Sequence, residues 1–124
     1  MNRLQHFLRA KTLYNLHSPF VYHLYTEVLF SRAKGEPRDR YEAVLWRLER
    51  HYGVDSERRD GEAVLCCRDG CFVVVDHPHR REARWQELIE EPRFRVSIDL
   101  FSVGIVVDNP RLSRQCFLLR DVVV

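Results

Sequence analysis

The spacing of the apolar residues changes near residue 60. Residues 39–52 are predicted to form one helix that Gly53 ends, and its apolar face consists of Tyr41, Val44, Leu45, Leu48 and Tyr52. From residue 63 onward, the runs AVLCC and CFVVVD flank RDG, a short turn sequence that is typical of a β-hairpin. Helices that precede hairpin-linked strands predict an α/β (α+β-like) fold with a mixed, largely antiparallel sheet.

Helical patterns also occur before and after these segments. Residues 2–13 and 18–32 each carry an amphipathic stripe, and the two helices are predicted to pack as a hairpin. Ser18 suits the cap position of the second helix. Pro19 suits its first position, because proline has no amide proton to leave unbonded. Residues 79–91 are predicted to form the one helix that covers the sheet.

Three more strands complete the predicted sheet. RFRVSIDLF alternates apolar and polar residues, so one of its faces is expected to be buried, and a hairpin near Ser102 joins it to VGIVV. CFLLR is the last strand, and the charged segment 54–62 is expected to be an exposed loop. The chain is then a single domain, 1–124, made of a helical leader (1–32), a helix (39–53) and a sheet-rich part (62–124).

Composition and charge limit the classes of partner. The chain has 124 residues, 45% hydrophobic and 31% charged, which is typical of one soluble domain. With 20 basic and 18 acidic residues the net charge is +2, so no nucleic-acid partner is predicted. In YEAVLWRLERHY the acids offset the bases, and the charged side chains are expected to face solvent. The sequence shows no signal peptide and no apolar run long enough to span a membrane. No membrane contact and a cytoplasmic location with reduced cysteines are therefore predicted.

Three cysteines and two histidines lie close together in the sequence: Cys66, Cys67, Cys71, His77 and His79. Their spacing matches no common zinc motif, and adjacent cysteines on a strand point to opposite faces, so no metal site is predicted. The length of the turn leaves two registers open. Either Cys67 lies opposite Phe72, or a three-residue turn places Cys67 opposite Cys71, where the two would form a disulfide or share a metal ion.

Two stretches at the ends of the chain carry a family resemblance. FLRAKTLYNLHSPFVYHLYTEVL holds an AKT…HSPFV pattern, and VVVDHPHRREARWQELIEEPRFRVSIDLFSVGIVV holds an IDLF-x-x-GIV pattern. They resemble the helical leader and the closing strand, helix and hairpin of a bacterial family of class I S-adenosylmethionine-dependent methyltransferases. CFLLR is similar to the short strand that follows in that family. The resemblance implies a remnant of a Rossmann-like methyltransferase.

The middle of the chain departs from that family. The family carries a glycine-rich loop at which the cofactor approaches the backbone, and only glycine leaves room for this approach. The glycines of this chain form no G-x-G cluster: Gly35, Gly53, Gly61, Gly70 and Gly104. We therefore expect no cofactor and no catalytic residue. S-adenosylmethionine is expected as a cofactor only if the chain is a shortened or split methyltransferase.

The resemblance also indicates three candidate ligand-binding residues. Asp76, His79 and Asp99 fall on polar positions of the family's C-terminal part. Asp76 ends a predicted strand, which is where α/β proteins place ligands. These residues imply an alternative function, a shortened or split S-adenosylmethionine-dependent methyltransferase with Asp76 and His79 near the substrate.

The leading hypothesis is a non-catalytic methyltransferase-derived domain that acts by self-association or by binding a protein partner. A remnant sheet would leave an edge open, and proteins usually cover or protect such edges. Trp46 lies off the apolar stripe of its helix, and the chain ends in an apolar VVV. The candidate interface residues, most simply in a symmetric dimer, are Trp46, Val122, Val123 and Val124.

Overall fold

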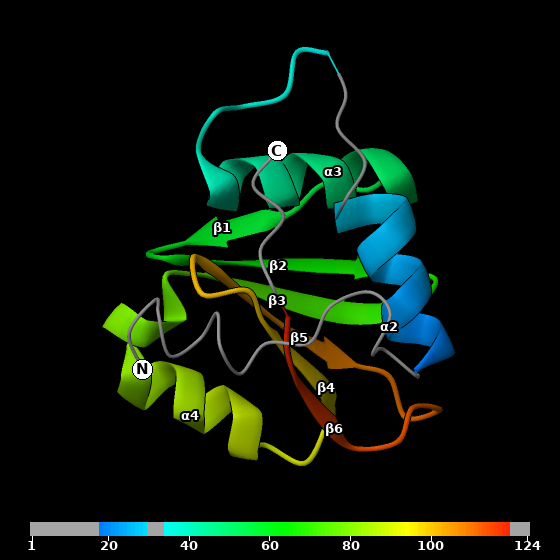
Figure 1. The fold of residues 1–124 in the computed structure, drawn as a ribbon, viewed down its shortest axis with the longest axis vertical. Coiled ribbons are helices and arrows are strands. Elements are labelled where there is room, and N and C mark those ends of the chain that lie inside the picture. Colours follow the sequence, from blue (N-terminus) through cyan, green and yellow to red (C-terminus); the bar gives the residue numbers. More distant parts are fainter. Residues whose placement is uncertain (1–17, 30–33, 120–124) are drawn as a thin grey trace.

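A six-stranded mixed sheet forms the centre of the protein, seen in a computed structural model that describes residues 18–29 and 34–119 (Figure 1). Its strands are β1 (Glu57–Arg59), β2 (Glu62–Cys67), β3 (Gly70–Asp76), β4 (Phe94–Asp99), β5 (Val103–Asp108) and β6 (Gln115–Leu118). Their order across the sheet is β1-β2-β3-β5-β4-β6, and every pair is antiparallel except β4 with β6. The predicted α/β fold with a largely antiparallel sheet is confirmed.

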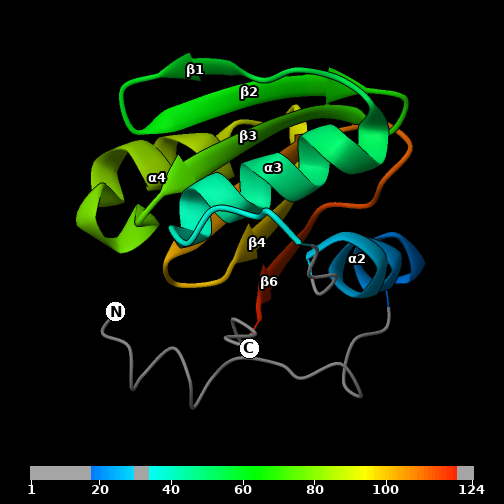
Figure 2. The same ribbon diagram turned by 90° about the horizontal axis from the view of Figure 1, so that it is seen from above.

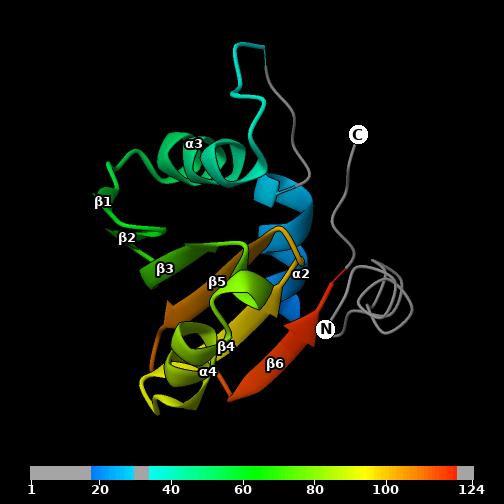
Figure 3. The same cartoon turned by 90° about the vertical axis from the view of Figure 1, so that its left-hand side faces the viewer.

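Helices cover both faces of this sheet. One face carries α2 (Pro19–His23), the π-helical segment η2 (Leu24–Leu29) and α3 (Arg40–Tyr52), and the other carries the 3-10 turn η3 (Pro78–Arg80) and α4 (Glu82–Glu90). Figure 2 and Figure 3 show α3 and α4 on opposite sides of the strands. The helix predicted to cover the sheet is therefore α4, and the helices that precede the sheet cover its other face. Within the described ranges, no helix has the length and apolarity that a membrane crossing requires.

The central strands are apolar because both of their faces are buried. Val74 of β3 and Ile105 of β5 pack toward α3, whereas Val106 of β5 packs toward α4. β4 differs from the prediction of one buried face, since Ser97 and Asp99 are also buried, with 5% and 7% of each residue exposed. The reason is that helical segments pack on the second face as well: α4 contacts β4, and His79 of η3 lies against Asp99.

Local hydrogen bonds set the ends of the helices. Ser18 Oγ accepts from the amide nitrogen three residues further on (3.4 Å), which confirms the predicted helix start. In α3, the Asp39 carboxylate accepts from the amide of Glu42 (3.0 Å), and Gly53 ends the helix with a φ of 68°. The helix predicted for residues 39–52 and its glycine stop are confirmed.

The helical leader is described only in part. The segment predicted as one helix over residues 18–32 is helical as far as Leu29, and it takes the π form from Leu24 onward. The end of that segment lies outside the described residues, as does the helix predicted for residues 2–13.

Arg47 is buried in α3, although its charged neighbours predicted a side chain facing solvent. Only 5% of the residue is exposed. Its guanidinium forms an ion pair with Glu36, in which Nε donates to the carboxylate (2.9 Å), and it also donates to the carbonyl oxygen of Leu29. A charged side chain can be buried when it is paired and hydrogen-bonded in this way. Arg47 thereby joins α3 to the segments that precede it.

Residues 54–62 contain the strand β1, so the prediction of a loop throughout this segment is wrong. Glu57 lies opposite Val64 of β2 in an antiparallel pair. All three residues of β1 are exposed, so no alternation of apolar residues marked a strand here. Arg58 forms an ion pair with Glu42 of α3, which holds this edge of the sheet against the helix.

The β2–β3 hairpin has a register that differs from both alternatives left open by the sequence. Its turn consists of residues 68–69, so Cys67 pairs with Gly70 and Cys66 lies opposite Cys71. Cys66 and Cys71 form a disulfide, and Cys67 is a free thiol. The expected reduced state of all the cysteines and the suggested pairing of Cys67 with Cys71 are both wrong.

Two contacts account for this register. A side chain at Gly70 would overlap the carbonyl oxygen of Asp108 in β5, so the glycine is needed in the strand rather than in the turn. At the turn, Tyr52 Oη donates to the Asp69 carboxylate (2.7 Å). Burial and this bond to a carboxylate raise the pKa of Tyr52, so its hydroxyl stays a donor at neutral pH. The end of α3 thereby positions the turn.

Trp85 of α4 packs directly on Gly104 of β5. A Cβ atom at Gly104 would lie 2.7 Å from two carbons of the indole and 3.1 Å from a carbon of Pro78. Contacts as short as these are not tolerated between packed carbon atoms, so glycine is the residue that lets α4 approach the sheet.

Gly104→Ala is expected to destabilise the fold by about 1–3 kcal/mol, because the added methyl group overlaps a ring in a close-packed layer. Urea unfolding measures this loss. The double variant Gly104→Ala/Trp85→Leu removes the overlap, so its loss should be smaller than the sum of the two single losses. Additive losses would mean that the indole does not limit the side chain at residue 104.

Candidate functional site

The structure brings two of the three candidate ligand-binding residues into contact. At the end of β4, Asp99 Oδ2 lies 2.6 Å from Nε2 of His79 in η3, and 10% and 15% of these side chains are exposed. The other carboxylate oxygen, Oδ1, accepts from the amide of Phe101 (2.8 Å). Because an ionised carboxylate can only accept, His79 donates from Nε2. Asp99 therefore holds both the imidazole and the next turn of the chain.

This contact fixes the turn between β4 and β5. Phe101 has a φ of 71°, which is uncommon for a residue with a side chain. The amide of Ser102 donates to the carbonyl of Leu100 (3.0 Å), so the three residues form a γ-turn. The His79 ring stacks on the Phe101 ring, with 5.3 Å between centroids. The pair of His79 and Asp99 thus has a clear structural role.

Asp76 belongs to a second, separate pair. Its Oδ1 lies 2.7 Å from Nδ1 of His77, and 33% of each side chain is exposed. Since β5 separates β3 from β4, Asp76 and Asp99 lie at the same end of the sheet but bind different histidines. In the part of the chain that the structure describes, no group of three or more His, Cys, Asp or Glu side chains could hold a metal ion.

The candidate interface residue Trp46 is half-buried on α3. The guanidinium of Arg50 lies over its ring, 5.1 Å from the centroid, so the indole already has a cation–π contact within its own helix. The other three candidates, Val122, Val123 and Val124, lie outside the described residues.

The two edges of the sheet differ in charge. β1 consists of Glu57, Arg58 and Arg59, and a short, charged edge strand opposes the addition of a further strand. β6 has the sequence QCFL, without a charged residue, and its residues Gln115 and Cys116 are exposed. Of the two edges, β6 is the one that resembles a strand-pairing surface.

The backbone of β6 is open on one side among the described strands, because β6 pairs only with β4. On the paired side, the amide of Leu119 donates to the carbonyl of Asp99 (3.0 Å). Successive residues of a parallel pair direct their backbone groups to alternate sides. It follows that Cys116 and Leu118 present N–H and C=O groups to the open side.

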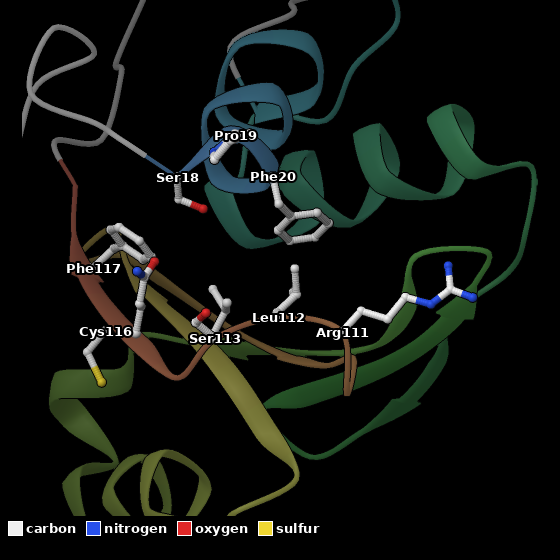
Figure 4. A pocket seen from close by; sticks show the side chains of 10 residues that line it. Ser18, Pro19, Phe20, Arg111, Leu112, Ser113, Cys116 and Phe117 are labelled. Carbon is white, nitrogen blue, oxygen red and sulfur yellow. The ribbon is translucent and has the colours of Figure 1, made fainter.

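A pocket of about 630 Å³ opens beside β6, between the start of α2 and the loop that precedes β6 (Figure 4). Phe20 and Leu112 point toward each other across it, and Phe117 adds a further apolar side chain. Arg111 and Ser113 supply polar groups to its lining. Sequence patterns did not indicate this pocket, because its walls come from segments far apart in the chain.

Asp99→Asn is expected to lower the free energy of unfolding by about 1–3 kcal/mol, because the amide places an N–H₂ group opposite one of the two buried donors that Asp99 now binds. Chemical unfolding measures the change. Asp108→Asn is the matched control, since Asp108 is a half-buried residue at the other end of the neighbouring strand, and its change should stay within about 0.5 kcal/mol. Equal losses for both variants would contradict the structural role of the His79–Asp99 pair.

No family model, no curated protein and no solved structure matches this chain. No comparison therefore tests the expected relationship to methyltransferases, which depends on the two stretches of sequence that resemble that family. The inference of function therefore rests on the geometry of the candidate site and not on a relative.

Proposed function

We propose that this protein is a non-catalytic, methyltransferase-derived domain that binds another polypeptide through the open edge of β6. The observation that carries the proposal is the contrast between the two edges of the sheet. β1 is short, charged and joined to α3 by the Arg58–Glu42 ion pair, whereas β6 is uncharged and has no partner strand on its outer side among the described residues. The partner is a second copy or a different protein.

The use of the glycines supports a non-catalytic role. Gly104 makes room for Trp85, and a side chain at Gly61 would overlap the guanidinium of Arg81. Gly70 lies against β5, and the other two glycines adopt positive φ angles, at 90° and 68°. Each glycine thus has a role in packing or in a turn of this chain, and none is needed to explain the approach of a cofactor.

The topology supports the same interpretation. Nucleotide cofactors of doubly wound α/β proteins bind at the carboxyl ends of parallel strands, where the strand order reverses. In this sheet the only parallel pair is β4 with β6, and the remaining neighbours are antiparallel, among the strands described. A cytoplasmic location is part of the proposal.

Cys116→Pro and Cys116→Val form a matched test of the β6 edge. Proline removes the N–H that faces the open side, whereas valine keeps it, and neither change removes a bond to β4. Sedimentation velocity measures self-association, and fluorescence anisotropy measures binding of the neutral, strand-forming peptide TVTLTVT. We expect the native and valine forms to bind in at least one assay and the proline form to bind about tenfold more weakly.

Thermal unfolding of the three forms checks that the proline variant keeps the fold. The proposal is contradicted if all three forms bind equally well, or if a folded native form associates with neither a second copy nor the peptide.

A second candidate function is a split methyltransferase that a second chain completes. It is favoured by the position of Asp76, His79 and Asp99 at one end of the sheet, where α/β proteins place their ligands. Titration calorimetry of this chain with S-adenosylmethionine is expected to give no binding heat. Stoichiometric binding that Asp99→Asn weakens, but Asp108→Asn does not, would favour the enzyme over the interaction domain.

A further inference from the structure

Three arginines lie around the start of β6: Arg95, Arg111 and Arg114. Val96 of β4 is opposite Gln115 of β6 in the parallel pair, so the residues that precede them, Arg95 and Arg114, are also neighbours. Arg111 lines the pocket beside this strand. The uncharged edge of β6 therefore begins beside a concentration of positive charge.

These arginines differ from several exposed arginines elsewhere on the protein. Arg58, Arg84 and Arg93 each form an ion pair with a glutamate. For Arg95, Arg111 and Arg114, no ion pair is recorded with any carboxylate in the described segments, and Arg114 donates only to the carbonyl oxygen of Ile89 (2.9 Å). Positive charge that has no ion pair among the described residues attracts a partner with carboxylates.

The pocket adds a requirement for an apolar side chain. A strand that pairs with β6 directs alternate side chains to the two faces of the sheet. On the α2 face it would pass the pocket, where Phe20, Leu112 and Phe117 supply apolar surface; Arg111 also lines this pocket, with its side chain extending away from Cys116 and Phe117 (Figure 4). A partner strand that fits therefore combines apolar residues with acidic ones.

We infer that the occupant of the β6 edge is an extended, acidic segment of a protein partner, which adds a strand to the sheet and pairs its carboxylates with Arg95, Arg111 and Arg114. This inference rests on the proposed function and names the chemistry of its partner. Backbone hydrogen bonds to Cys116 and Leu118 would supply affinity, and the arginines and the pocket would supply specificity. A second copy that pairs through its own β6 is a poorer occupant, because that strand, QCFL, carries no carboxylate to pair with the arginines.

The test compares three acetylated, fluorescently labelled peptides of equal length: acidic EVDLEVD, neutral TVTLTVT and basic KVKLKVK. Anisotropy is expected to rank them acidic, neutral, basic, with about tenfold or more between the first and the last, and added salt should weaken the acidic peptide selectively. Cys116→Pro should abolish binding of the acidic peptide, whereas Cys116→Val should retain it.

Arginine variants test the charge contribution. Arg111→Ala/Arg114→Ala should weaken the acidic peptide about three- to tenfold, and Arg80→Ala is the matched control, an exposed arginine at the opposite end of β4 and β6 that should have no effect. The reversal Arg111→Glu/Arg114→Glu should make the basic peptide bind better than the acidic one. This gain cannot result from a loss of folding.

Three results would overturn the inference. Equal binding of the three peptides, still sensitive to Cys116→Pro, would leave the proposed function intact but remove the acidic partner. Self-association at β6 with no peptide binding would make a second copy the occupant. Tighter binding of a single-stranded oligonucleotide than of EVDLEVD, lost in the arginine variants, would mean that the arginines bind phosphates instead.

Discussion

The structure depends on the burial of β3 and β5 between two layers of helices. The strands contribute valine and isoleucine to both faces, and the α3 and α4 layers cover one face each. The approach of α4 is limited by a single residue, because Trp85 can rest on β5 only where Gly104 has no side chain. A short chain obtains a two-sided core in this way, with antiparallel hairpins in place of the strand–helix crossovers that a parallel sheet needs.

The use of antiparallel hairpins affects where a ligand or a partner could bind. Hairpins bring the ends of successive strands together with tight turns, and here the turn after β4 is held by Asp99, His79 and Phe101. At that end of the sheet, the Asp99 carboxylate therefore holds the backbone of the turn and the imidazole of His79. The sheet also stops at β6, whose outward backbone groups have no partner strand among the residues described. In the described part of the chain, the groups left for a partner are thus the backbone N–H and C=O groups along the β6 edge, rather than side chains in a crevice at the end of the sheet.

Sequence patterns predicted the elements that local rules determine. The cap at Ser18, α3 with its Gly53 stop and the hairpins follow from side-chain capping, helical periodicity and turn residues. What could not be predicted depends on contacts between distant segments. β1 has no apolar alternation, Arg47 is buried only because Glu36 and Leu29 meet it, and the cysteine register depends on contacts at Gly70 and Asp69. The candidate site shows the same limit: the sequence indicated Asp99 and His79, but not the contact between them, because they lie 20 residues apart in the chain.

The path of the chain into β6 explains why positive charge lies beside the open edge. Both sides of β5 are occupied, by β3 and by β4, so the chain leaves β5 near the start of β4, passes the pocket beside α2 in a loop and continues as β6 on the far side of β4, parallel to it. That loop carries Arg111 and Arg114, so the crossover itself delivers positive charge to the start of the open strand. Elsewhere, glutamates neutralise arginines such as Arg58 and Arg84. Among the described residues, this edge combines backbone groups without a partner strand, an apolar pocket and arginines without an ion pair, and these features are complementary to an extended acidic chain in geometry and in charge.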